Sequence, residues 1–170
     1  MSSLSNKKPT LHLRAQIVKG IRSFFDQHAF LEVDTPIVVQ SPGMEPHIDA
    51  FETTFENQTL YLHTSPEYAM KRLLCAGYER IYQLCKTFRN EPTSTMHNPE
   101  FTMLEWYRAH ADYTHIMHDT EQLVASLAQN LLDTSILQYN NHTIDLTPPW
   151  QRLSLHEALI QYAQITADPF

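Results

Sequence analysis

The stretch TFRNEPTSTMHNPEFTMLEWY, residues 87–107, decides the fold that we expect for this chain. It reads as two short strands joined by a polar loop that contains Pro92, Asn98 and Pro99. Alternate residues of a strand share a face. An antiparallel hairpin is therefore predicted, and one of its faces carries the following polar side chains: Gln83, Cys85, Thr87, Arg89, Glu91, Glu105 and Tyr107.

The apolar residues around this polar face favour a binding surface. The alternative is an ordinary surface hairpin, because alternating polar faces are common on half-exposed sheets. Phe88, Phe101, Leu104 and Trp106 flank the charges, however, and buried charge persists when it is paired or reserved for a ligand. An arginine there is suited to a phosphate, and glutamates are suited to an amine.

The segments before this hairpin predict a helix, a strand and a second hairpin. Thr10 is expected to cap a helix that runs to about His28. A strand over residues 31–35 should end at Pro36, and a hairpin should pair residues 51–55 with 60–63 around a turn at Asn57 and Gln58.

Helix signals follow at Thr64-Ser65-Pro66-Glu67, where Ser65 is an expected N-cap and Pro66 the first helical residue. This helix should turn Tyr68, Leu73 and Leu74 inward and stop at Gly77.

Later in the chain, a helix is predicted from Asp112 to about Leu132 and a hairpin with its turn at Asn140 and Asn141. A capping box of Ser154 and Glu157 should then begin a last helix. Antiparallel hairpins mixed with helices predict an α+β fold, an antiparallel sheet flanked by helices.

The composition describes a globular protein that we expect in the cytoplasm. The length of 170 residues suits one domain, 10–170, after a flexible N-terminal tail, 1–9. Two cysteines are too few for a disulfide framework, and the N-terminus lacks the apolar core of a signal peptide. The net charge of -7 disfavours nonspecific nucleic-acid binding, and no membrane association is expected.

No metal site is predicted from the ten histidines, because neither HExxH nor paired Cys/His spacing occurs. The best candidate ligands are His115, His118, Asp119 and Glu121, for which a solvated helix face is the preferred interpretation.

The residues RNE followed by HNPEFTMLEWY resemble motif 2 of the class II aminoacyl-tRNA synthetases, in particular the lysyl branch. The resemblance extends from about Leu11 to Phe170. The helix and strand that close at Pro36 are similar to motif 1 of that family, which implies a homodimer interface. An ordinary edge strand is the alternative there.

The resemblance implies roles for residues of the motif 2 hairpin and of the TSPEY segment. Arg89 would be the catalytic residue that holds the ATP α-phosphate, with Asn90, Glu91 and Asn98 as further ATP contacts. The amino-acid pocket would be lined by Ser65, Pro66, Glu67, Glu105 and Tyr107.

A motif 3, with its second ATP-binding arginine, is not recognisable in this sequence, which holds three glycines. The family implies Mg²⁺ as well as ATP, and its ligands are expected in a C-terminal half. We therefore expect the N-terminal part of a catalytic domain, inactive or nearly so by itself.

Within the family, the chain is similar to the elongation factor P lysyltransferases, which are paralogues of lysyl-tRNA synthetases. Three features support this: the short segment before the first helix, Trp106, and a motif 2 loop without Lys or Arg. The implied substrates are lysine or β-lysine and elongation factor P, with tRNA disfavoured. A catalytic piece of a lysyl-tRNA synthetase is the second interpretation, and a non-catalytic dimerisation module is the third.

Overall fold

The structure is a computed structural model that describes residues 4–165. The chain divides into two compact units, residues 1–116 and 117–170, and each is described by itself. The first unit contains the predicted motif 2 hairpin and every residue proposed above for a binding site. Mixed antiparallel sheets and helices confirm the α+β class.

The first unit begins with a 3-10 turn, η1 (Leu4–Lys7), that continues directly into helix α1 (Lys8–Gln27). The predicted cap at Thr10 is therefore wrong, because the first helical residue is Lys8 and the N-cap is Lys7. Pro9 lies in its first turn, where a fixed φ and a missing N–H cost nothing.

The central sheet has the strand order β1-β5-β6, formed by β1 (Leu31–Glu32), β5 (Arg80–Phe88) and β6 (Glu100–Arg108). Strands β5 and β6 pair antiparallel over nine residues each, which confirms the predicted hairpin. Strand β1 pairs parallel to β5 and is shorter than predicted. Thr35, expected to continue it, instead donates its hydroxyl proton to Gln83 Oε1 at 3.0 Å.

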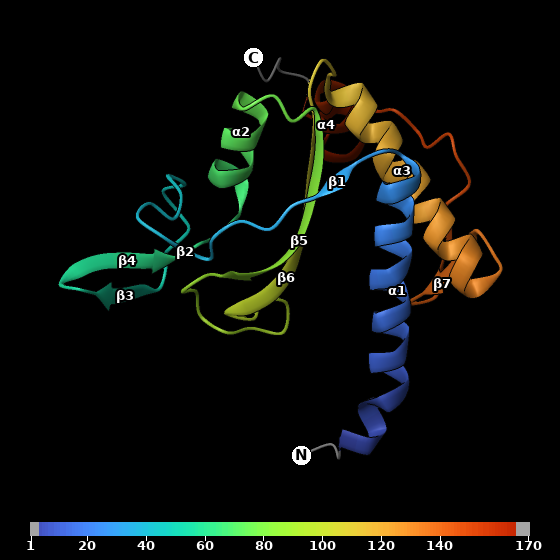
Figure 1. The fold of residues 1–170 in the computed structure, drawn as a ribbon. Helices are drawn as coiled ribbons and strands as arrows, with labels where there is room; N and C mark the ends of the chain where they lie inside the picture. The colour runs from blue at the N-terminus through green and yellow to red at the C-terminus, as the bar shows by residue number, and fades with distance from the viewer. Residues whose placement is uncertain (1–3, 166–170) are drawn as a thin grey trace. The chain divides into compact units, whose positions relative to one another are not determined.

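The two faces of the β5–β6 pair have different partners. Tyr82 lies opposite Trp106, and both contact Phe25 of α1, with ring centroids 4.5 and 5.6 Å away. Gln83 lies opposite Glu105 on the other face, toward the segment that begins α2 (Glu67–Cys75). Figure 1 shows α1 and α2 on opposite sides of this pair of strands.

A second small sheet has the order β2-β4-β3, from β2 (Val38–Val39), β3 (Glu52–Phe55) and β4 (Gln58–Leu62). Its hairpin turn lies at Glu56 and Asn57, whose φ angles are 48° and 63°. The predicted turn is thus wrong by one residue. Two successive positive φ angles define the turn whose twist matches the flanking strands.

Helix α2 starts one residue later than predicted, with Pro66 at the N-cap position. The inward position of Tyr68 is wrong, because this side chain is 39% exposed and Met70 is the fully buried residue. The predicted stop at Gly77 is confirmed by a φ of 95°, which favours glycine.

Helix α3 (Tyr113–Leu132) runs from the first unit into the second, and Asp112 Oδ1 accepts from the Thr114 N–H at 3.0 Å as predicted for a cap. The second unit adds β7 (Ile136–Tyr139), β8 (His142–Asp145) and α4 (Leu155–Ala163). The turn at Asn140 and Asn141 and the capping box of Ser154 and Glu157 are both confirmed.

The expectation of a solvated face around His118 is wrong for Asp119 and Glu121, which are 4% and 3% exposed. Glu121 accepts a hydrogen bond from the Trp150 N–H at 2.9 Å and forms an ion pair with Arg152. The hydrogen bond from Arg152 lowers the pKa of the Glu121 carboxyl. This is how a buried carboxylate is stabilised.

No helix in the described part of the chain combines the length and apolar character that crossing a membrane requires.

The stacking of Phe25 on Tyr82 predicts a large stability effect. Phe25 is fully buried, so Phe25→Ala should lower the free energy of unfolding by about 3–5 kcal/mol, measured by urea denaturation. Phe55→Ala is the control: this ring is 63% exposed, and its removal should change the same quantity by about 0.5 kcal/mol or less. Equal losses for both variants contradict the packing that we describe.

Candidate functional site

The carboxylate of Glu105, on β6, is the centre of the candidate site. Ser65 Oγ donates to its Oε2 at 2.7 Å, and the Tyr107 hydroxyl donates to its Oε1 at 2.5 Å. Both oxygens are therefore held by neutral donors, which fixes the carboxylate without neutralising it. A half-buried, oriented carboxylate is suited to an ammonium group.

Tyr107 is kept as a hydrogen-bond donor by its surroundings. Burial raises the pKa of its phenol well above the ordinary value of 10.0, and the hydrogen bond to Glu105 raises it further. The phenol stays protonated throughout the neutral range and continues to donate to the carboxylate.

Ser65 connects Glu105 to the beginning of α2. Its hydroxyl oxygen accepts a hydrogen bond from the Glu67 N–H at 3.1 Å while its proton goes to Glu105. Pro66, the residue between Ser65 and Glu67 in the sequence, is buried. The Glu67 side chain forms an ion pair with Lys71, one helical turn later. A second carboxylate thus lies close to the first, at the end of the helix that favours negative charge.

Arg89 follows directly after β5 and borders the same region. Its Nε donates to the Thr64 carbonyl oxygen at 3.4 Å, next to Ser65, and its guanidinium lies 5.3 Å from the centroid of the Phe101 ring. The Arg89 N–H also donates to the Pro99 carbonyl at 3.0 Å, which closes the loop between β5 and β6. This half-buried cation is placed where it could hold an anionic group.

The loop residues Asn90, Glu91 and Asn98 are less tightly connected. The Asn90 N–H donates to the Asp49 carbonyl at 2.8 Å, and Asn98 is exposed on the loop. Within residues 4–165, no hydrogen bond or ion pair joins Glu91 to Glu105 or Tyr107. The structure therefore brings Ser65, Glu105 and Tyr107 into contact, but gives no contact for the predicted convergence of Glu91.

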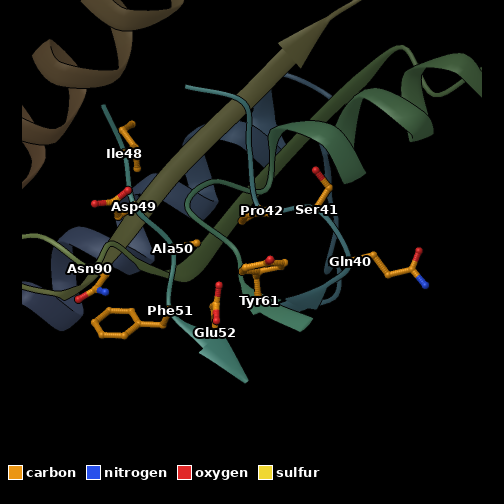
Figure 2. A pocket seen from close by; sticks show the side chains of 10 residues that line it. All are labelled: Gln40, Ser41, Pro42, Ile48, Asp49, Ala50, Phe51, Glu52, Tyr61 and Asn90. Atoms are coloured by element: carbon orange, nitrogen blue, oxygen red, sulfur yellow. The ribbon is translucent and has the colours of Figure 1, made fainter. Parts of the chain in front are cut away.

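An open pocket of about 690 Å³ lies beside Asn90 (Figure 2). Asn90 is the one predicted site residue that lines it; the others are Gln40, Ser41, Pro42, Ile48, Asp49, Ala50, Phe51, Glu52 and Tyr61. Its wall holds two carboxylates and two aromatic rings. Nothing in the spacing of residues 40–52 in the sequence indicates a pocket.

Two further residues at the site carry no predicted role. Thr64 contributes the carbonyl that meets Arg89, and its hydroxyl donates to the Pro42 carbonyl at 3.0 Å. Gln83, opposite Glu105, is 1% exposed. The alternation along the strand placed Gln83 on the polar face, so its position near Glu105 could be predicted from the sequence. The contact of the Thr64 backbone carbonyl with Arg89 could not, because every residue has such a carbonyl.

Metal binding has no visible basis in the described chain. Residues 4–165 contain no group of three or more His, Cys, Asp or Glu side chains that could hold an ion. The residues present therefore do not form a Mg²⁺ site by themselves, and we assign no step to that ion.

Comparison with known proteins gives a consistent family. Residues 3–168 match the model of tRNA synthetases class II (D, K and N). The chain is 41% identical over 160 residues to a lysine–tRNA ligase of Legionella pneumophila (strain Corby), covering 92% of this chain and 32% of that protein. It is 40% identical over 166 residues to the lysine–tRNA ligase of Trichormus variabilis, covering 96% of this chain and 29% of the relative. The chain thus spans about a third of the length of the relatives it matches.

The raised pKa of Tyr107 can be tested by alkaline titration followed by phenolate absorbance. Tyr107→Phe should leave the absorbance change around pH ~10 almost unaltered, because a buried phenol bonded to a carboxylate does not ionise there. A clear reduction of that absorbance change in the Tyr107 variant contradicts the burial and hydrogen bonding described above.

Proposed function

This chain belongs to the family of tRNA synthetases class II (D, K and N), and from that premise we propose that it serves in the ATP-dependent transfer of lysine or β-lysine to a lysine of elongation factor P. The reaction has two steps. A carboxylate oxygen of the amino acid attacks the α-phosphorus of ATP, and the bond to pyrophosphate breaks. The acceptor amine then attacks the acyl carbon of the adenylate, AMP leaves, and the amine loses a proton.

The two carboxylates support a substrate with two ammonium groups. Glu105 is held by Ser65 and Tyr107, and Glu67 lies at the start of α2 beside them. Lysine and β-lysine each carry two ammonium groups, and an oriented carboxylate pairs well with such a group when water is partly excluded. We assign both carboxylates to recognition of the amino acid.

Arg89 is assigned to the ATP α-phosphate. A guanidinium stabilises the charge that develops on phosphoryl oxygens, and its planar donors suit two oxygens at once. The bond from Nε to the Thr64 carbonyl and the contact with Phe101 hold Arg89 beside the amino-acid pocket. Asn90, Glu91 and Asn98 are assigned to the nucleotide from the same loop.

The composition of the loop between β5 and β6 supports the proposal that the acceptor is a protein. Residues 90–100 read NEPTSTMHNPE and contain two glutamates but no lysine or arginine. Binding of tRNA depends on basic side chains that neutralise phosphates. An acidic, exposed loop directly after Arg89 disfavours tRNA and suits an acceptor without a phosphate backbone.

A lysyl-tRNA synthetase is the second candidate, because the relatives described above are lysine–tRNA ligases with 40–41% identity. In that case the adenylate chemistry and the roles of Arg89, Glu105 and Tyr107 are unchanged. The acceptor is then the ribose of tRNA instead of an amine.

We also propose a homodimer that uses α1 and β1. Leu11, Leu13 and Leu31 are 58%, 41% and 51% exposed, which leaves apolar area on the helix and on the edge strand. Burying such side chains against a second copy is a common driving force for association.

The acceptor can be identified with radiolabelled lysine, ATP, elongation factor P and lysine tRNA in one reaction with the complete gene product. We expect the label on elongation factor P and none on tRNA, because the loop lacks basic side chains. Label on tRNA alone replaces the proposal by the second candidate. A folded protein that labels neither acceptor and forms no adenylate contradicts both.

The role of Arg89 predicts the effect of Arg89→Ala on adenylate formation by the complete gene product. Lysine-dependent exchange of pyrophosphate into ATP should fall at least about 100-fold, because a preorganised cation at the phosphate is lost. Met44→Ala is a suitable control, since this side chain is 81% exposed and lies in a loop. Normal exchange by the Arg89 variant contradicts its assignment.

A further inference from the structure

The proposed function does not explain why the side-chain amide of Gln83 is buried. The side chain is 1% exposed, in the middle of β5. Its Oε1 accepts a hydrogen bond from the Thr35 hydroxyl, but within the described residues its Nε2 has no oxygen acceptor, and its one partner is the weakly accepting sulfur of Cys85. A buried donor without a strong acceptor destabilises the fold, so its retention calls for a reason.

The strand register places Gln83 directly opposite Glu105. Opposed residues of an antiparallel pair point to the same face, with Cβ atoms about 4.5–5.5 Å apart. A change of side-chain torsion alone can therefore bring the Gln83 amide to the Glu105 carboxylate. No backbone movement is needed.

Donors and acceptors at this point are complementary. An ionised carboxylate has about four acceptor positions, and Ser65 and Tyr107 use two of those on Glu105. The Gln83 amide has two N–H groups to offer, while the Thr35 bond fixes its oxygen from the other side. The charged and titratable side chains around this point include Asp34, Glu67, Lys71, Cys85 and Tyr107. Glu105 is the carboxylate directly opposite Gln83.

We propose that Gln83 is a positioning residue for Glu105: when an ammonium group binds to that carboxylate, the Gln83 amide supplies a further hydrogen bond to it from the floor of the sheet. Thr35 orients the amide for this purpose. The inference rests on the proposed function, because it takes Glu105 as the group that receives the amino acid.

The test compares binding of lysine and of ATP to the complete gene product by calorimetry. Gln83→Leu keeps the approximate volume and removes the amide; Gln83→Met does the same with an unbranched chain. Both should weaken lysine binding about tenfold and leave ATP binding unchanged, because one hydrogen bond to a charged group is lost. Thr35→Val should give a smaller loss in the same direction, because the amide then lacks its orienting bond.

Thr87→Val is the matched control. It removes a fully buried polar side chain from the same face of β5, opposite Phe101 and away from Glu105. Its lysine affinity should equal that of the wild type. Circular dichroism and urea denaturation establish that each variant is folded before binding is measured.

The outcomes separate this inference from the proposed function. Unchanged lysine binding by folded Gln83→Leu, or equal losses for lysine and ATP, overturns the positioning role even if lysine is transferred to elongation factor P. A selective loss of lysine binding supports it, even if the wild type transfers lysine to tRNA instead. A wild-type protein that binds no lysine overturns both.

Discussion

The register between β5 and β6 is the constraint on which the rest of the first unit depends. Gln83 opposite Glu105 and Tyr82 opposite Trp106 assign one face to polar chemistry and the other to the aromatic cluster at Phe25. A slip of one residue would exchange the two faces completely. The stacking of Phe25 on Tyr82 therefore contributes to stability and also ensures that Glu105 and Tyr107 point to the opposite side.

The polar face holds one carboxylate in a half-buried place by hydrogen bonds to both of its oxygens. Ser65 and Tyr107 each donate to a different oxygen of Glu105, and neither brings a formal charge. The negative charge is thus available to a cation, while the hydrogen bonds compensate for lost water. Arg89, bonded to the carbonyl next to Ser65, adds a positive group at the border of the same region. The separation of opposite charges within one site suits a substrate that has an ammonium at one end and meets a phosphate at the other.

Signals confined to a few neighbouring residues predicted one hairpin turn and one helix cap correctly. Asn140 and Asn141, and Ser154 with Glu157, behave as expected because the turn and the cap are made within a few residues. The burial of two acidic residues, by contrast, depends on contacts far apart in the sequence. Asp119 and Glu121 look solvated in a sequence, but both are buried, and Arg152 reaches Glu121 across 31 positions. Thr35 lies outside β1, and its hydroxyl bonds to Gln83, which is 48 residues away. The polar face itself was predictable from alternation, whereas its contacts with Thr64 and Ser65 depend on a loop whose path no pattern describes.

The double use of the Ser65 hydroxyl has a mechanical consequence. One oxygen atom both receives the Glu67 amide proton and donates to Glu105, so the first turn of α2 and the middle of β6 are joined through a single atom. A cation that draws Glu105 toward itself must stretch this link or take the helix start with it. We therefore expect the exchange of the Glu67 amide hydrogen with solvent to change when a cation binds to Glu105. Binding at Glu105 is thus coupled to the first turn of α2 through the Ser65 hydroxyl.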